Sequence, residues 1–281
     1  MPHAPIAVGG VGGSGTRVIA NILQYCGIFI GSDLLPSNDT IWYAALFGRR
    51  NVLLDDDEEL RALGELFFRQ MADPTPLSPA ELTRLRSLEE MPRHLHGPKI
   101  IHEWLEGFIV HCATAAPAER WGWKVPYTHV LIDRWLAWHP TLKYVHVTRN
   151  GLDMAYSQNQ NQLGKWGPIF LNREVEIGPR DSLKFWCAVQ RRVARIGARY
   201  PDRVLQISFD RLIRDPVPEI DVLLRFIGAD LTAAQKDELA SSIVPPETVN
   251  RHKAHDISAL DPEDVAYARQ DNAAPQTDDR T

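Results

Sequence analysis

Short apolar runs alternate along the chain with longer stretches in which apolar residues recur every three or four positions. The apolar runs cover residues 5–10, 120–125, 142–149 and 202–209. The longer periodic stretches predict helices at 15–26, 128–138, 150–160 and 181–199. Strands that alternate with helices favour a parallel sheet, because helical crossovers cover both of its faces. We therefore predict an α/β fold with a central parallel sheet and helices on both faces.

The stretch from 40 to 118 interrupts this alternation. It shows helical segments at 57–71, 79–90 and 98–115, separated by proline-containing sequences, and it has no strand pattern. We interpret this stretch as a helical insertion, a lid over the mouth of the sheet, within a single domain that spans 1–265. The remaining residues, 266–281, are polar and lack periodicity, which predicts a disordered tail.

Composition narrows the class of protein further. A chain of 281 residues with 44% hydrophobic residues is long enough for a sizeable core. Its net charge of −5 gives no global electrostatic attraction to nucleic acid or to an anionic membrane, so any anion site must be local. The three cysteines are far apart, and the N-terminus lacks the pattern of a secretory signal. We predict a cytoplasmic protein with no transmembrane segment and no nucleic-acid partner, and we leave its oligomeric state open.

A glycine-rich segment, GGVGGSGTR, follows the first predicted strand and leads directly into a helix. A turn of this kind at a helix start binds anions through its free backbone amides. An ATPase loop would carry lysine at the position of Thr16, which argues against an ordinary ATPase or kinase. Gly10, Gly12 and Gly15 also satisfy GxGxxG, and Asp33 lies where a ribose-binding acid belongs. An NAD(P)-dependent oxidoreductase of the Rossmann type is therefore an alternative.

A second candidate anion site follows the third predicted strand. The strand ends in Thr148-Arg149, the chain turns through Asn150-Gly151, and the next helix carries Ser157 about two turns in. A guanidinium and a hydroxyl on the same side make a compact site for a phosphate monoester. The sequence therefore predicts two phosphate sites, each at the end of a strand.

These two sites and two further segments together resemble the sulfotransferase family, whose donor is 3′-phosphoadenosine 5′-phosphosulfate (PAPS). WGWKVPYTHVLIDRW at 121–135 resembles the family's K-x-P segment, and FDRLIRDPVPEIDVLLRFIGADLT at 209–232 resembles its C-terminal stretch. The resemblance covers 5–35 and 120–255 and leaves the helical insertion unmatched. It implies a P-loop NTPase-like fold.

The resemblance also implies a set of binding residues. The glycine-rich loop would hold the 5′-phosphosulfate through Gly12, Gly13, Ser14, Gly15, Thr16 and Arg17. Arg149 and Ser157 would hold the 3′-phosphate, together with Arg251 and Lys253 from a basic loop near the C-terminus. Gly13 departs from the family, which has a lysine or arginine there, and Arg17 is the nearest substitute. Lys124 is a second candidate for charge near the transferring group.

The implied reaction moves a sulfuryl group to a hydroxyl or amine acceptor by in-line displacement. It needs a general base, for which we rank Asp33 first and Asp39 second, with His102 and His129 as weaker candidates. The loop amides, Arg17 and Lys124 would supply the positive charge, so we expect no metal. The acceptor is a small molecule, a sugar, a lipid or a peptide, and the sequence leaves this choice open. A catalytically inactive nucleotide-binding module on the same fold is the non-enzymatic alternative.

Overall fold

The computed structural model describes residues 3–273, with side chains for residues 3–270. The chain divides into two compact units, which we describe separately. Unit 1 comprises residues 3–9, 16–145 and 202–205, and unit 2 comprises residues 10–15, 146–201 and 206–273. The prediction of one domain over 1–265 stays a prediction.

A parallel sheet of four strands has the order β2-β1-β3-β4. The strands are β1 (Ile6–Gly10), β2 (Gly122–Lys124), β3 (Lys143–Thr148) and β4 (Val204–Ser208). β1 pairs in parallel with β2, and Val8 lies opposite Lys124. Every residue of β1 and β2 is buried, as expected for parallel strands that are covered on both faces. The predicted strands and the predicted α/β class are confirmed.

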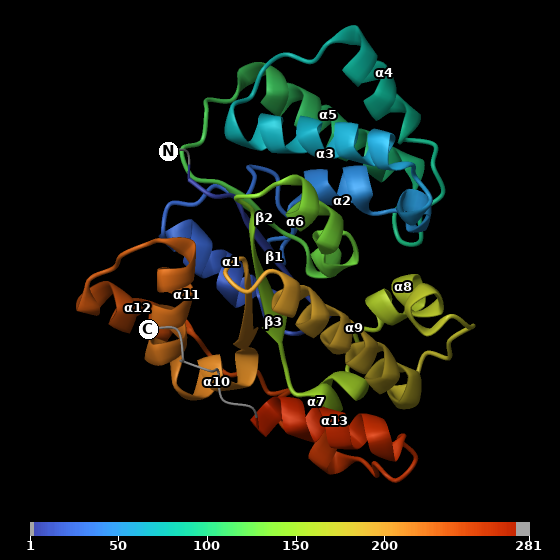
Figure 1. Cartoon of the computed structure of the whole chain (residues 1–281), viewed down its shortest axis with the longest axis vertical. Helices are drawn as coiled ribbons and strands as arrows, with labels where there is room; N and C mark the ends of the chain where they lie inside the picture. Colours follow the sequence, from blue (N-terminus) through green and yellow to red (C-terminus); the bar gives the residue numbers. More distant parts are fainter. Residues whose placement is uncertain (1–2, 274–281) are drawn as a thin grey trace. The chain divides into compact units, whose positions relative to one another are not determined.

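The helices of unit 1 include the whole of the predicted insertion. They are α1 (Thr16–Tyr25), α2 (Ile41–Phe47), α3 (Asp57–Ala72), α4 (Pro79–Ser87), α5 (Pro98–Thr114) and α6 (Ile132–Trp138), with 3-10 turns at Arg50–Leu53 and Pro126–Val130. Within the described residues 41–118 no strand occurs, so the predicted helical character of this stretch is confirmed. α5 packs against both α2 and α4 (Figure 1).

An aromatic core joins the insertion to β2 and α6. Tyr43 of α2 stacks on Trp123 of β2 with ring centroids 5.5 Å apart. Phe68 of α3 contacts Trp123 at 5.2 Å and Trp135 of α6 at 5.8 Å. Trp123 and Trp135 are fully buried. The insertion is therefore part of the core of unit 1, and its role as a lid stays a prediction.

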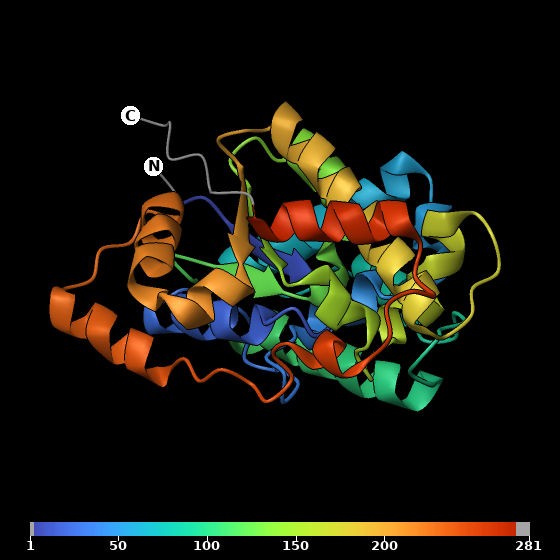
Figure 2. The same cartoon turned by 90° about the horizontal axis from the view of Figure 1, so that it is seen from below.

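Unit 2 is mainly helical outside the ends of β3 and β4. Its helices are α7 (Gly151–Ala155), α8 (Asn161–Leu171), α9 (Pro179–Arg199), α10 (Phe209–Arg214), α11 (Pro216–Ile227), α12 (Ala233–Ser242) and α13 (Pro262–Ala273), with a 3-10 turn at Arg251–Ala254. α7, α8 and α13 all pack against α9, and Figure 2 shows α13 running across this group. Across residues 3–273, no helix combines the length and the apolar character needed to span a bilayer.

The helix predicted at 150–160 is shorter in the structure and ends at Ala155. Ser157 accepts a hydrogen bond from the backbone N–H of Asn159 at 3.2 Å, and the side chain of Asn159 accepts one from the N–H of Asn161 at 3.4 Å. Such local side-chain bonds compete with helical ones, which explains why the helix stops here. Ser157 therefore lies beyond α7 and not two turns inside it.

The predicted disordered tail at 266–281 is helical up to Ala273, within α13. Ala268 is fully buried, and a Cβ added to Gly151 would lie 3.0 Å from its Cβ. Packing against α7 thus supplies stabilisation that the weak periodicity of this segment does not reveal. The rest of the predicted tail, 274–281, lies outside the described residues.

Candidate functional site

The glycine-rich loop of unit 2, residues 10–15, follows directly on β1. Gly13 and Gly15 have φ angles of +93° and +92°, and the N–H of Ser14 donates to the carbonyl of Val11 at 3.0 Å. Residues at positive φ turn successive backbone amides toward one side, which creates a concave anion site. The Ser14 side chain is 1% exposed, and its hydroxyl has no hydrogen-bond partner among the described residues. A buried hydroxyl without a protein partner can donate a hydrogen bond to a bound anion.

Arg149 lies just past the end of β3 and is 4% exposed. Its Nη1 donates to the carbonyl of Gly13 at 3.1 Å, and its Nη2 donates to the carbonyl and the hydroxyl of Thr248 at 2.8 and 2.9 Å. The guanidinium lies 5.5 Å above the ring of Phe209. Its Nε has no partner within the described part of the chain. Burial, and then the charge of Arg251, lower the pKa of Arg149. Unit 2 thus holds a buried guanidinium beside the glycine-rich loop.

Ser157 comes close to this loop although it is not on a helix. A Cβ added to Gly13 would lie 3.6 Å from the Ser157 hydroxyl. The structure therefore brings together three residues that the sequence selects from distant segments, namely Gly13, Arg149 and Ser157. It also explains the glycine at position 13, because any other residue would be strained at that φ.

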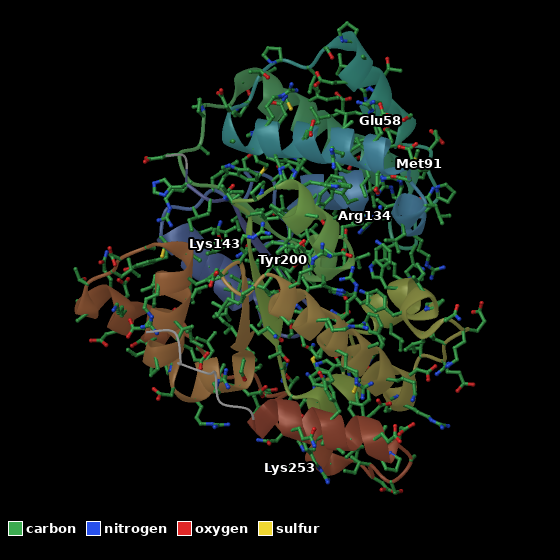
Figure 3. The ribbon with its side chains drawn as sticks, viewed as in Figure 1. Glu58, Met91, Arg134, Lys143, Tyr200 and Lys253 are labelled. Atoms are coloured by element: carbon green, nitrogen blue, oxygen red, sulfur yellow. The ribbon has the colours of Figure 1, made fainter. Side chains whose placement is uncertain are left out.

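The segment from Thr248 to Lys253 lies beside Arg149. Arg251 donates from Nε to the Thr248 carbonyl at 3.2 Å. Lys253 is exposed, pairs with no described carboxylate, and lies at the edge of the view in Figure 3. Of the two basic residues predicted here, Arg251 is therefore the one held near Arg149.

Sequence reasoning missed Asp153, which is 1% exposed and fastens this segment to α7. Its carboxylate accepts hydrogen bonds from the backbone N–H of Asn250 at 2.7 Å and from Nδ1 of His252 at 2.6 Å. The sequence feature that points to Asp153 is its position as the one charged residue of α7, whose sequence is GLDMA.

In unit 1, Lys124 ends β2 and is 1% exposed. Its ammonium bonds to the Asp39 carboxylate and, at 2.5 Å, to the carbonyl of Ser37. Burial lowers the pKa of Lys124, the charge of Asp39 raises it, and the charge of Arg17 lowers it. The structure thus brings together Lys124, Asp39 and Arg17. Arg17 is exposed and forms no ion pair with any described residue.

Asp33, our first candidate for the general base, lies near α5. Its Oδ2 is 2.5 Å from the position of a Cβ added to Gly107. Between described residues, its carboxylate makes no hydrogen bond to Lys124. The structure therefore separates the two candidate acids, with Asp39 on the lysine and Asp33 against α5.

The candidate histidines have other surroundings. His129 is fully buried. Nδ1 of His102 lies 3.1 Å from Oε2 of Glu89 and 3.2 Å from Nη1 of Arg86. Glu89, His102 and Glu106 have potential metal-ligand atoms within 4.8 Å of one another. Arg86 forms ion pairs with both glutamates, so a guanidinium already supplies positive charge to this cluster, and we assign no metal to it.

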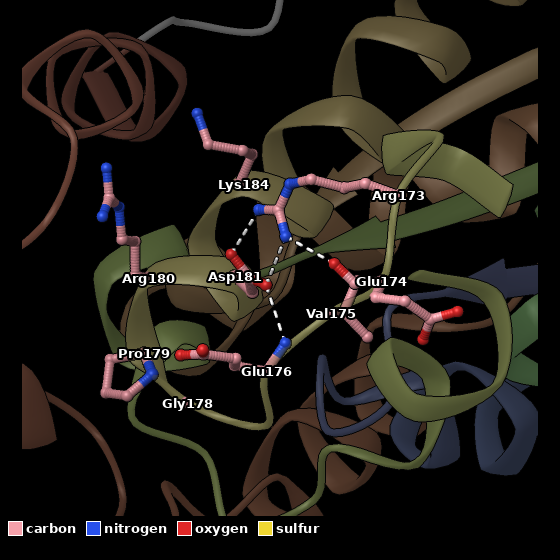
Figure 4. Close-up of a pocket in the computed structure, with 9 residues that line it drawn as sticks. All are labelled: Arg173, Glu174, Val175, Glu176, Gly178, Pro179, Arg180, Asp181 and Lys184. Atoms are coloured by element: carbon pink, nitrogen blue, oxygen red, sulfur yellow. Dashed lines mark hydrogen bonds and ion pairs between the residues drawn. The ribbon is translucent and has the colours of Figure 1, made fainter. Parts of the chain in front are cut away.

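Unit 2 also has a hollow of about 690 Å³ at the start of α9 (Figure 4). Arg173 clamps Asp181 there with two bonds, at 2.9 and 2.5 Å, and the backbone N–H of Glu176 donates to the same carboxylate. The charges of Arg173 and Asp181 thus neutralise each other within the hollow. None of the residues predicted from the sequence lines it.

Comparisons with known proteins agree with this architecture. The sequence model of the Sulfotransferase family matches residues 5–233. No curated protein matches the chain in sequence.

Solved structures of sulfotransferases resemble this fold at low sequence identity. The sulfotransferase domain of the Synechococcus PCC 7002 olefin synthase is 16% identical, with 98% of this chain and 96% of that chain covered and a TM-score of 0.50. The sulfotransferase domain from the curacin biosynthetic pathway is 11% identical, with 97% and 98% covered and a TM-score of 0.49. The first of these resemblances supports the fold alone. The family match over most of the chain decides the assignment, and the protein belongs to the sulfotransferase family.

Proposed function

We propose that this protein transfers a sulfuryl group from PAPS to a hydroxyl or amine acceptor and releases adenosine 3′,5′-bisphosphate. The observation that carries the proposal is the buried Arg149 guanidinium, which bonds to the glycine-rich loop and keeps its Nε without a partner in the described chain. A buried arginine beside an anion-binding loop suits a ligand with more than one phosphate group.

The residues of unit 2 would divide the donor between them. The glycine-rich loop and the Ser14 hydroxyl suit the 5′-phosphosulfate, since the loop turns backbone amides toward one side and the hydroxyl has no partner among the described residues. Arg149, Ser157 and Arg251 suit the 3′-phosphate, because a guanidinium binds phosphate in a bidentate way. NAD has no phosphate monoester for these three residues, and for NADP, which has one, the match of residues 5–233 to the Sulfotransferase family argues against an oxidoreductase. The oxidoreductase alternative is therefore weaker.

The residues of unit 1 would serve the transfer itself. The acceptor oxygen or nitrogen forms a bond to sulfur, the bond from sulfur to the bridging oxygen breaks, and the base takes the acceptor proton. Arg17 and Lys124 would stabilise the negative charge that develops on the bridging oxygen. Asp33 stays our first candidate for the base, and the contact between Asp39 and Lys124 supports Asp39 as its rival.

An inactive module on the same fold would bind the nucleotide but would not need these unit 1 residues. Arg17→Ala separates the two cases, because it should lower sulfuryl transfer about 100-fold or more in an enzyme that uses this cation. Lys99→Ala is the matched control, since Lys99 is also exposed in unit 1 and lies outside the candidate site. Unchanged turnover in Arg17→Ala would remove Arg17 from the mechanism.

Isothermal titration with adenosine 3′,5′-bisphosphate tests the proposed donor. The wild-type protein should bind it, and Arg149→Ala should weaken binding by about 10-fold to 100-fold, since one charge-assisted contact contributes about 1.5–3 kcal/mol. Arg180→Ala, an exposed arginine of the hollow in unit 2, should bind like the wild type. Equal binding by the Arg149 and Arg180 variants would contradict the proposal.

A further inference from the structure

A buried carboxylate holds the segment from Thr248 to His252 against α7. Asp153 is 1% exposed and accepts three hydrogen bonds from this segment. The donors are the backbone N–H of Asn250 at 2.7 Å, the backbone N–H of His252 at 3.1 Å, and Nδ1 of His252 at 2.6 Å. A buried charge is costly unless it is well paired, so these three bonds keep the carboxylate and the segment together.

The backbone of this segment depends on that anchorage. Asn250 has a φ of +62°, in the left-handed region, and a 3-10 turn begins at the next residue, Arg251. Asparagine adopts this conformation more readily than most residues, but it does so where the surroundings hold it. The bond from its N–H to Asp153 supplies such a restraint on one side, and the bonds of His252 supply it on the other.

The anchored segment brings a second guanidinium to Arg149. Thr248 accepts two bonds from Nη2 of Arg149, and its carbonyl also accepts the bond from Nε of Arg251 at 3.2 Å. The two arginines therefore share one carbonyl oxygen and lie close together. Like charges held at this range repel each other, and a dianionic phosphate between them would remove that cost.

We infer that Asp153 and His252 are positioning residues, which latch the segment 248–252 to α7 and so hold Arg251 beside Arg149 as the second cation for the 3′-phosphate. The inference rests on the proposed function, because it assigns the 3′-phosphate to this pair of arginines. The latch therefore adds to the preference of the protein for a nucleotide with a 3′-phosphate over one without it. His252 acts through Arg251 and does not itself touch the nucleotide.

The test compares the Kd values of adenosine 3′,5′-bisphosphate and adenosine 5′-phosphate for each variant. In the wild type the bisphosphate should bind about 100-fold more tightly, because two guanidinium groups reach its extra phosphate. His252→Ala should cut this preference about 10-fold and leave the affinity for adenosine 5′-phosphate unchanged. His252→Asn should restore most of the preference, because its amide can donate to Asp153 in place of Nδ1.

A double-variant cycle tests whether the latch acts through Arg251. Arg251→Ala alone should lower the preference, and adding His252→Ala to it should cause little further loss, since both changes remove the same contact. His255→Ala is the matched control, because that histidine lies just past the segment 248–252 and stacks on Tyr156, with ring centroids 4.2 Å apart. It should keep the wild-type preference.

Each outcome decides the inference. A wild-type preference in His252→Ala, or fully additive losses with Arg251→Ala, would overturn it while the proposed donor stands. A wild-type protein that does not bind the bisphosphate would overturn the proposed function and the inference with it. Thermal unfolding of each variant without nucleotide shows whether it is folded, and the 5′-phosphate affinity then separates a lost latch from a damaged site.

Discussion

Alanine substitutions at three glycines of the loop should have graded effects on stability, because their backbones and neighbours differ. A Cβ on Gly15 would lie 2.1 Å from Cδ2 of Phe209, and the φ of Gly15 is +92°. A Cβ on Gly13 would lie 3.6 Å from its nearest neighbour, but φ is +93°. A Cβ on Gly12 would have a nearest neighbour at 3.5 Å, and this φ is not positive.

The expected magnitudes follow from these two factors. A left-handed backbone costs a non-glycine residue about 1–2 kcal/mol, and overpacking costs about 1–3 kcal/mol more. Gly15→Ala bears both costs and should lower the free energy of unfolding by about 2–5 kcal/mol. Gly13→Ala bears only the backbone cost, about 1–2 kcal/mol. Gly12→Ala should stay within about 0.5 kcal/mol of the wild type.

Urea denaturation of the three variants measures these values from the midpoint and the slope of each transition. Introduced into a Phe209→Ala background and compared with that single variant, Gly15→Ala should cost only the backbone part, because the ring that it would overpack is absent. Equal stability of Gly15→Ala and Gly12→Ala, or an equal loss of free energy in all three variants, would contradict these values. The affinity for adenosine 3′,5′-bisphosphate should fall in the same order, least in Gly12→Ala and most in Gly15→Ala, because the loop amides are displaced least in the first variant and most in the last.

Three further predictions concern buried groups outside the loop. Burial lowers the pKa of His146 from 6.5 to about 4, so its neutral form stabilises the fold fully above pH 6.5. The free energy of unfolding should therefore fall by about 3 kcal/mol in total from pH 6.5 to 4, and a pH series of urea melts should show a smaller fall for His146→Gln. Lys124→Met leaves Asp39 without its partner and should lower the free energy of unfolding by about 1–3 kcal/mol. It should also lower kcat more than it lowers the affinity for the donor. Equal losses in kcat and in donor affinity would contradict a role of Lys124 in transfer. Gly64→Ala should destabilise the protein by about 1–3 kcal/mol in thermal melts, because the new Cβ would lie 2.5 Å from the Trp135 ring. This cost should outweigh the better helix propensity of alanine. A variant more stable than the wild type would contradict this packing.

Strand positions were predictable because burial on both faces imposes continuous apolar runs. β1 and β3 have the short, β-branched sequences that such strands require, and both appear at the predicted places. Arg149 and the glycine-rich loop follow these strands directly, so their approximate location could be predicted as well. The long amphipathic helices α3, α5 and α9 were predictable for a similar reason, since each spans several turns.

Features that depend on tertiary contacts were not predictable. The sequence around Ser157 shows apolar periodicity, yet local hydrogen bonds of Ser157 and Asn159 end α7 early. The helix that runs into the predicted tail depends on packing of Ala268, which no local pattern reveals. The bond between Asp153 and His252 joins residues 99 positions apart, and a single sequence does not signal such a pair. The pairing of Lys124 with Asp39 belongs to the same class.

Thermal unfolding with added nucleotides tests the proposed donor most directly. Adenosine 3′,5′-bisphosphate at about 100 times its Kd should stabilise the protein by about 2.7 kcal/mol and raise the unfolding temperature by about 5 °C. NAD and ATP, measured as controls at the same concentration, should have much smaller effects. A rise with NAD and none with the bisphosphate would contradict the account and return the glycine-rich loop to a dinucleotide-binding role.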